Sequence, residues 1–462
     1  MFDKLDQHSD ALALISHRGV VLTYAQLIDS ADRIGSHVKK RSLVVIICTN
    51  TVESICGYVG ILRSDAVVLL LNETLNRELV GQLINNYRPE FIYSPKSYTL
   101  NTDGGRVVKT FGRYILIQKY EAPKINLNPE LSLLMTTSGT TGSPKVVRLA
   151  KRNLVSNAIS IVNYLGIEKV DRAITTMPMS YSYGLSIINS HLYRGASIIV
   201  SDKTLLERGF WDIWEQGKPS SFSGVPYLYE LLMKLKFEDK VLPGLRYLTH
   251  AGGRLPTNLK TKIVKSCKRK RVKFYCMYGQ TEAAPRMGYL PWENVEKTGC
   301  IGIPVPSGRF WLVDDGGIVI DSDEVVGELV YQGPNVGLGY AESAEDLNRS
   351  DENNGVLMTG DLAKRDSEGF YYLVGRKSRF VKLYGNRIDL DSLETLISSN
   401  GCDCACVAKG EKLRVFLTEK ACKCSVWEIL KRLGIHQRAV EILEIQEIPR
   451  NEFGKTFYTQ LQ

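Results

Sequence analysis

The stretch LLMTTSGTTGSPKVVRLA, residues 133–150, sets a dense group of hydroxyl side chains, glycines and a lysine between two apolar runs. Backbone N–H groups, hydroxyls and a cation are the donors that a polyphosphate needs. The β-branched residues after Lys145 predict a returning strand, so the loop connects two strands and has no helix dipole to offer. We therefore expect Lys145 and the loop to hold phosphate groups, the loop residues being Thr137, Ser138, Gly139, Thr140, Thr141 and Gly142.

The Walker A loop, G-x-x-x-x-G-K-[ST], is the first alternative for such a stretch. Here the two glycines are three residues apart and Pro144 directly precedes Lys145. A Walker loop also opens a helix, whereas a strand is predicted here. Both differences argue against a P-loop NTPase or kinase.

Length and composition predict a globular protein of two or three domains. The chain has 462 residues, of which 44% are hydrophobic and 24% charged. Its 59 Lys and Arg against 50 Asp and Glu give a net charge of +9, which suits an anionic ligand or an acidic partner but also an ordinary basic surface. The basic run KSCKRKRVK, residues 265–273, contains no aromatic residue, so nucleic-acid binding is not expected.

The N-terminal residues lack the apolar core of a signal peptide, and no apolar run approaches the roughly 20 residues that span a bilayer. We therefore expect a cytoplasmic protein whose ten cysteines are reduced thiols. Five of them cluster, and their spacing differs from C-x-x-C zinc knuckles. Small core or surface residues are the favoured interpretation and metal or redox chemistry the alternative for Cys402, Cys404, Cys406, Cys422 and Cys424.

Hydrophobic patterning predicts an α/β fold. Apolar runs such as LVVIIC and AVVLLL alternate with helical segments, which indicates large mixed and parallel sheets flanked by helices. Thr23 and Gln26 have capping-box spacing at the start of the first helix. From about residue 298 short strands and turns predict a β-rich part. A small α+β tail with two helices follows, so we expect a large domain over residues 1–375 and a small one over 376–462.

Further motifs follow in a recognisable order. They are LTYAQL, GYVGILRSDAVVLLLNETL, MPMSYSYGL, SGVPYLY, HAGGRLP, YGQTEA, GELVYQGPNVGLGY, TGDLAKRDSEGFYYLVGR, VKLYGNRIDLDSLE and PRNEFGKT. Together with the opening loop they resemble the adenylate-forming superfamily of acyl-CoA synthetases, aryl-acid ligases, nonribosomal-peptide adenylation domains and luciferases. The resemblance covers residues 12–457 and implies that ATP activates a small carboxylic acid to an acyl-adenylate with release of pyrophosphate. The acyl group then passes to a thiol, on an acyl carrier protein or CoA, after a rotation of the mobile small domain.

The resemblance also implies roles for single residues, with ATP and Mg²⁺ as cofactors. Lys455 bridges the substrate carboxylate and the α-phosphate, Thr281 donates to that phosphate, and Glu282 binds Mg²⁺, which needs few protein carboxylates beside phosphates. A carboxylate can accept hydrogen bonds from both hydroxyls of a ribose, and the resemblance assigns this role to Asp361. The expected nucleoside contacts are Asp361, Arg376, Tyr278, Gly279, Gly252 and Gly253.

The acyl-side residues depart from some family members. Tyr181 stands where acyl-CoA synthetases commonly have His, and Ser182 where amino-acid-activating domains place Asp. An unpaired buried ammonium would be costly, so an α-amino acid is disfavoured. We expect Tyr181, Ser182, Tyr183 and Ser223 to contact a small aryl acid or a short hydroxylated or aliphatic acid. The alternatives are an amino-acid-activating enzyme and a non-catalytic nucleotide-binding homologue, which intact Glu282, Asp361 and Lys455 argue against.

Overall fold

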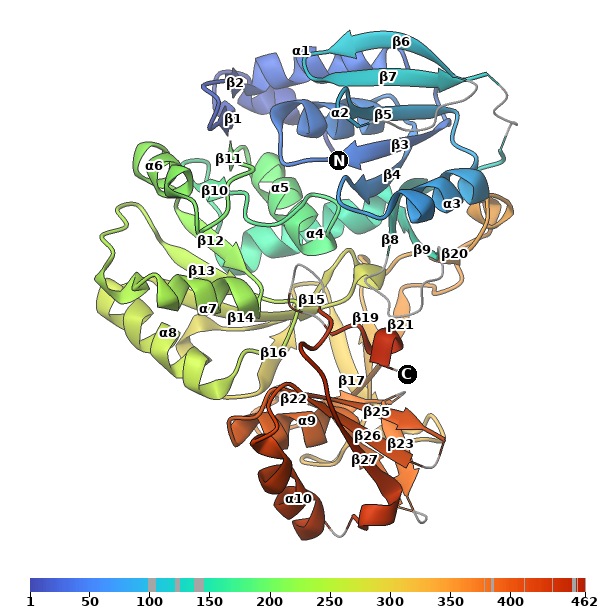
Figure 1. Ribbon diagram of the computed structural model, residues 1–462. Coiled ribbons are helices and arrows are strands. Elements are labelled where there is room, and N and C mark those ends of the chain that lie inside the picture. The colour runs from blue at the N-terminus through green and yellow to red at the C-terminus, as the bar shows by residue number, and fades with distance from the viewer. Residues whose placement is uncertain are drawn as a thin grey trace.

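The structure is a computed structural model that describes residues 1–98, 105–120, 125–136, 145–377, 379–383, 386–410, 412–433, 435–450, 454 and 456–461. Its fold is α/β, with two large sheets flanked by helices and a small α+β C-terminal part. Figure 1 shows that part, in red tones, gathered below the larger body. No described helix combines the length and apolar character needed to cross a bilayer.

The first large sheet has eight strands with a parallel centre. The apolar runs of the sequence form adjacent parallel strands β3 and β4, and all six side chains of β3 are buried. The last strand before the hydroxyl loop, β8, pairs antiparallel with β9 directly after it, which confirms the predicted strand–loop–strand arrangement. In spatial order the strands are β20 (Gly339–Ala341), β9 (Val146–Ala150), β8 (Leu131–Thr136), β4 (Val67–Asn72), β3 (Leu43–Cys48), β5 (Phe91–Pro95), β7 (Tyr114–Lys119) and β6 (Gly105–Phe111).

The second large sheet has fourteen strands and joins a parallel half to an antiparallel half. The predicted β-rich part supplies the antiparallel half, and β15 pairs antiparallel with β14 where the two halves meet. In spatial order the strands are β18 (Val319–Ile320), β17 (Arg309–Val313), β19 (Gly327–Gln332), β21 (Val356–Arg365), β22 (Tyr371–Arg376), β16 (Cys300–Pro304), β15 (Arg286–Leu290), β14 (Lys273–Gly279), β13 (Tyr247–His250), β12 (Ser221–Gly224), β10 (Arg172–Ile174), β11 (Ser197–Val200), β1 (Leu12–Ser16) and β2 (Val21–Thr23).

Two helices separate these sheets and make the core continuous. Leu154 and Leu185, on α4 and α5, pack in a cluster with strand residues of the first sheet, and Ile161 and Ile187 on the same helices pack against the second. Figure 1 shows α4 and α5 between the sheets. The predicted capping box of α1 is present. The helices of the large part are α1 (Tyr24–Gly35), α2 (Val52–Arg63), α3 (Arg77–Tyr87), α4 (Lys151–Leu165), α5 (Ser182–Arg194), α6 (Arg208–Gly217), α7 (Pro226–Lys234) and α8 (Thr257–Lys270).

The C-terminal part has its own apolar cluster, formed by residues between Val381 and Val440. It holds the two expected helices. The prediction that all ten cysteines are reduced is wrong for one pair, because Cys402, just before β25, forms a disulfide with Cys422 at the start of α10. No potential metal site of three or more His, Cys, Asp or Glu occurs in the described ranges. The elements are β23 (Phe380–Leu383), β24 (Asn386–Asp389), α9 (Leu390–Ser399), β25 (Cys404–Lys409), β26 (Lys412–Leu417), α10 (Cys422–Arg432) and β27 (Val440–Glu444).

Candidate active site

A cleft of about 2670 Å³ lies at the carboxyl ends of β13 and β14 and extends to the small C-terminal part. In open α/β sheets ligands bind outside the carboxyl ends of the strands. The residues lining it come from segments far apart in the chain, from Lys145 to Thr459. The cleft therefore collects side chains from most of the motifs that the sequence analysis singled out.

One wall of the cleft is built around Asp361, which is 4% exposed. Asp361 on β21 lies opposite Arg376 on β22 in the antiparallel ladder, and Arg376 Nε is 2.9 Å from Asp361 Oδ1. The other carboxylate oxygen accepts hydrogen bonds from Tyr278 Oη at 2.5 Å and Gln280 Nε2 at 2.9 Å. Gln280 was not among the predicted site residues, although it lies inside the YGQTEA motif.

These contacts shift the titration of the groups around the carboxylate. Burial, and then the negative charge of Asp361, raise the pKa of Tyr278 far above its usual value, so the phenol stays protonated and donates. The same carboxylate raises the pKa of Arg376. Arg376 is half exposed at 49% of its side-chain surface, so it is the partner of Asp361 with the most freedom to move.

Two glycines in the neighbouring wall are packed closely against other protein atoms. Gly252, after β13, has a φ of +84°, and an added Cβ there would lie 2.6 Å from the hydroxyl oxygen of Tyr181. At Gly279, which ends β14, an added Cβ would lie 1.8 Å from the carbonyl oxygen of Pro285. Gly253 lines the cleft beside Gly252. A side chain at Gly252 or Gly279 would therefore collide with neighbouring protein atoms, which explains why glycine stands there.

Lys145 and Glu282 are brought together by Tyr340. The ammonium of Lys145 lies 3.7 Å from the centroid of the Tyr340 ring, and the Tyr340 hydroxyl donates to Glu282 Oε1 at 2.5 Å. Burial and the nearby charge of Glu282 raise the pKa of Tyr340, which keeps its hydroxyl a donor. The loop residues Thr137, Ser138, Gly139, Thr140, Thr141 and Gly142 lie outside the described residues.

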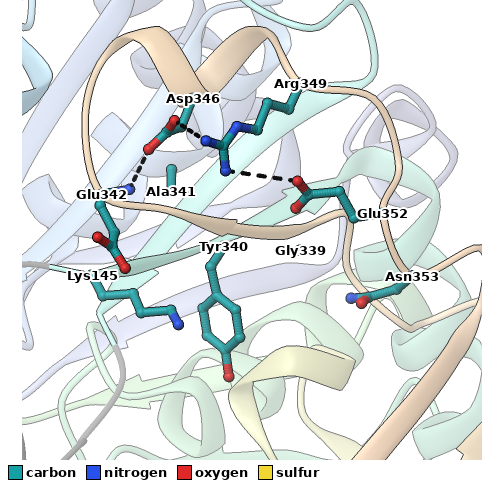
Figure 2. A pocket seen from close by; sticks show the side chains of 9 residues that line it. All are labelled: Lys145, Gly339, Tyr340, Ala341, Glu342, Asp346, Arg349, Glu352 and Asn353. Carbon is teal, nitrogen blue, oxygen red and sulfur yellow. Dashed lines mark hydrogen bonds and ion pairs between the residues drawn. The ribbon is translucent and has the colours of Figure 1, made fainter.

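Tyr340 belongs to β20, whose position depends on a buried arginine. Arg148 on β9 is fully buried and donates to the carbonyls of Tyr340 at 3.1 Å and Leu338 at 2.8 Å, and to Glu352 at 2.8 Å. Figure 2 shows the small polar pocket beside this strand, of about 370 Å³, with the Lys145 side chain extended beside the Tyr340 ring and an Asp346–Arg349–Glu352 chain of ion pairs above. Tyr340 is thus held rigidly between the two charged residues, and sequence reasoning did not assign it a role.

Thr281 and Glu282 form the short 3₁₀ turn η3 (Thr281–Ala283) after β14. The backbone of this turn is fixed because Gly337 N donates to the carbonyl of Glu282 at 2.8 Å. Thr281 Oγ1 lies 3.1 Å from Ser182 Oγ at the start of α5. A single carboxylate such as that of Glu282 fits Mg²⁺, which usually takes one or two protein carboxylates and completes its shell with phosphate oxygens and water.

The predicted acyl-side residues divide into two groups. Tyr181, Ser182 and Tyr183 line the cleft. Ser223 is buried and is not among the cleft-lining residues; its hydroxyl accepts from Thr249 Oγ1 at 2.8 Å. The Tyr183 hydroxyl also points into the protein, donating to the carbonyl of Thr249 at 2.8 Å. Substrate contacts by Ser223 stay a prediction that this geometry does not favour.

The small C-terminal part closes one side of the cleft. Lys455 lies outside the described residues, while its neighbours Gly454 and Thr456 line the cleft. A Cβ added to Gly454 would lie 3.5 Å from the Cβ of Tyr227 on α7, so this segment approaches the large part closely. Arg254 Nη1 donates to Thr395 Oγ1 on α9 at 2.8 Å and links the loop after β13 to the small part.

Comparisons of the sequence with known proteins identify a family and several relatives. The sequence profile of the family described as AMP-binding enzyme matches residues 1–341. The 2-succinylbenzoate–CoA ligase of Bacillus cereus is 29% identical over 393 residues, with 82% of this chain and 78% of the relative covered. That of Bacillus licheniformis is 25% identical over 391 residues, with 82% and 79% covered.

Solved structures share the fold at low sequence identity. O-succinylbenzoate coenzyme A synthetase from Bacillus subtilis, in complex with AMP, superimposes with a TM-score of 0.80 at 21% identity, covering 99% of this chain and 97% of that one. ATP-bound MatB from Rhodopseudomonas palustris gives 0.78 at 19% identity, covering 100% and 97%. Since the profile match spans most of the chain, the protein belongs to the AMP-binding enzyme family and is an AMP-forming acid–thiol ligase.

Proposed function

We propose that the cleft binds ATP with its ribose at Asp361 and its triphosphate between Lys145 and Glu282, and that an acid enters beside Tyr181 and Ser182. The observation that carries this proposal is that one cleft contains both the buried carboxylate of Asp361 and the group formed by Lys145, Tyr340 and Glu282. The adenine is proposed to lie between Gly252–Gly253 and Tyr278–Gly279, and the position of all four residues along the same cleft supports this placement.

The first half-reaction joins two anions, so its barrier is electrostatic and orientational. An oxygen of the substrate carboxylate forms a bond to the α-phosphorus, and the bond from that phosphorus to the oxygen of the β-phosphate breaks, which releases pyrophosphate. Mg²⁺ held at Glu282 would neutralise charge on the phosphate oxygens. Lys145 would neutralise charge on the leaving pyrophosphate, and Thr281, whose Oγ1 lies 3.1 Å from Ser182 Oγ, would donate to the α-phosphate.

Lys455 is proposed as the cation that bridges the carboxylate and the α-phosphate. Its neighbours Gly454 and Thr456 line the cleft, which supports the assignment. The negative charge that Lys455 would neutralise is greatest in the transition state. Removing the Lys455 side chain should therefore lower the rate of adenylation more than the affinity for ATP.

In the second half-reaction we propose CoA as the thiol, with an acyl carrier protein as the alternative acceptor. The names of the curated relatives, which are CoA ligases, support CoA. The proposed large domain, residues 1–375, and small domain, residues 376–462, would change their relative position between the two steps, bringing the segment from Lys382 to Arg387 to the cleft. ATP, Mg²⁺ and CoA are all cytoplasmic compounds, and we propose that compartment for the enzyme.

An amino-acid substrate is the second enzymatic candidate. The first turn of α5 contains no acidic residue, and Ser182 at its start is hydrogen-bonded to Thr281. A substrate ammonium at this end would therefore lack the carboxylate that its burial requires. This observation supports an acid without an α-amino group.

ATP–pyrophosphate exchange with a panel of aryl, aliphatic, hydroxy and amino acids tests the function. We expect exchange with one group of non-amino acids, and acyl transfer to CoA when CoA is added. Lys455→Ala should abolish exchange while ATP affinity changes only a few-fold, and Lys420→Ala, an exposed lysine in the small part, should leave exchange unchanged. Exchange with α-amino acids alone, or near-normal pyrophosphate release by Lys455→Ala, would contradict the proposal.

A further inference from the structure

Arg286 is a buried cation at the acyl end of the cleft. It is the first residue of β15, it lines the cleft, and it is only 3% exposed. Its backbone is held firmly, because the side-chain amides of Asn157 and Asn335 both donate to its carbonyl oxygen at 2.9 Å. The position of the guanidinium is therefore set by the protein before any substrate binds.

The guanidinium has only neutral partners. Arg286 Nε and Nη2 donate to Ser186 Oγ at 3.3 and 3.1 Å, and Nη1 donates to the sulfur of Met277 at 2.9 Å. Its carbon lies 4.0 Å from the centroid of the Tyr183 ring. A guanidinium has five N–H donors, so these three bonds leave two for a ligand.

No carboxylate lies within ion-pair distance of Arg286 in the part of the chain that the structure describes. The surrounding phenols supply no negative charge, because burial raises the pKa of Tyr181 to about 12 and also raises the pKa of Tyr183, although Arg286 acts in the opposite direction. An arginine cannot lose its proton in a protein, and an uncompensated buried charge is strongly destabilising. By contrast, buried Arg148 has Glu352 as a partner.

We propose that Arg286 binds a second carboxylate of the acyl substrate, so that the enzyme selects dicarboxylic acids. This inference rests on the proposed function, in which the reacting carboxylate lies near Thr281 and Ser182. A carboxylate is the natural ligand because a guanidinium can donate to both of its oxygens at once.

The position of Arg286 relative to the reacting end limits the size of the acid. Ser182, which contacts Thr281, and Ser186, which contacts Arg286, are four residues apart on α5. Residues at this spacing lie on the same face of a helix, about 5–6 Å apart. The two carboxylates are therefore separated by a short spacer, of the length found in succinate, glutarate or a benzene dicarboxylate.

Matched acid pairs test the proposal in the full-length enzyme. ATP–pyrophosphate exchange is measured with butyrate against succinate, pentanoate against glutarate and benzoate against phthalate or isophthalate. We expect at least one diacid to exceed its monoacid partner about 100-fold or more in kcat/KM. Arg286→Met should remove this preference by raising the KM for the diacid, whereas Arg286→Lys should retain part of it. The matched control is Arg309→Met, an exposed arginine on β17.

Thermal unfolding and the KM for ATP with a monoacid check that Arg286→Met is folded. Equal or better exchange with every monoacid, or an unchanged preference in folded Arg286→Met, would overturn the inference. Absence of exchange with all acids would refute the proposed function instead. In that case the thermal unfolding temperature, measured with AMP and each acid present, still tests whether Arg286 binds a second carboxylate. A rise in this temperature with diacids alone, which Arg286→Met loses, would support the inference. If no diacid raises the unfolding temperature of the wild type, the inference is excluded.

Discussion

Replacing one ribose hydroxyl of ATP with hydrogen tests the role of Asp361 without disturbing the protein. Its carboxylate has about four acceptor positions. Tyr278 and Gln280 use two on Oδ2 and Arg376 uses one on Oδ1, so one position remains beside the half-exposed arginine. A hydrogen bond to a charged group contributes about 1.5–3 kcal/mol. We therefore expect the better-held hydroxyl to contribute about 10- to 150-fold in kcat/KM, and the second hydroxyl less unless Arg376 moves aside.

The assay is ATP–pyrophosphate exchange with ATP, 2′-deoxy-ATP and 3′-deoxy-ATP, for wild type and Asp361→Asn. In the variant the penalty for the favoured deoxy analogue should fall to about 3-fold or less, since a neutral amide replaces the charged acceptor. Lys364→Gln, a change at a half-buried lysine on the same strand, should keep the wild-type penalty. A penalty above 10-fold that survives in Asp361→Asn would show that the ribose lies elsewhere.

Two other changes test the site and its surroundings. Tyr340→Phe keeps the ring under Lys145 but removes the hydrogen bond to Glu282, so kcat/KM for ATP in the exchange assay should fall about 10-fold or more. Tyr340→Leu also removes the cation–π contact, which contributes about 0.5–2 kcal/mol, so kcat/KM should fall up to about 30-fold further. A fall of less than about 2-fold in Tyr340→Phe would refute the positioning role. Burial lowers the pKa of His250 to about 3, from about 6.5 in an unfolded chain, so unfolding takes up a proton between these values and stability is lost as the pH falls through this range. From pH 7 to pH 5 the free energy of unfolding should fall by about 2 kcal/mol because of His250, as measured by urea titration. A folded His250→Asn variant should not show this fall. An equal fall in both proteins would contradict the assignment of the pH dependence to His250.

The strand framework and the position of the opening loop could be predicted from local pattern. Continuous apolar runs such as residues 43–48 and 67–71 are long enough, and β-branched enough, to indicate buried parallel strands. The returning strand after Lys145 followed from its β-branched residues, and it is β9. These features depend on neighbours in sequence, which is the information that one chain carries.

The residue pairings that could not be predicted depend on contacts between distant segments. Tyr340 reaches Glu282 only because β20 pairs with β9, nearly two hundred residues earlier in the chain. The Asp361–Arg376 pair depends on the register between β21 and β22, and the Cys402–Cys422 disulfide depends on the approach of the first residue of α10 to the segment just before β25. The hydroxyl of Ser223 forms its hydrogen bond with Thr249 inside the protein, so a contact between Ser223 and the substrate stays a prediction.

Charge at the two ends of the cleft is arranged differently, and this difference points to how the enzyme selects its acid. At the nucleotide end the charged groups already have partners: Asp361 pairs with Arg376, Glu282 accepts from Tyr340, and Lys145 lies over the same ring. This end is organised before ATP arrives, which reduces the cost of ordering it on binding. At the acyl end the cation of Arg286 is buried among neutral groups. An acid that brings a second negative charge there relieves an existing cost, whereas a monoacid leaves it in place, so discrimination arises from the protein's own unbalanced charge as well as from the shape of the pocket.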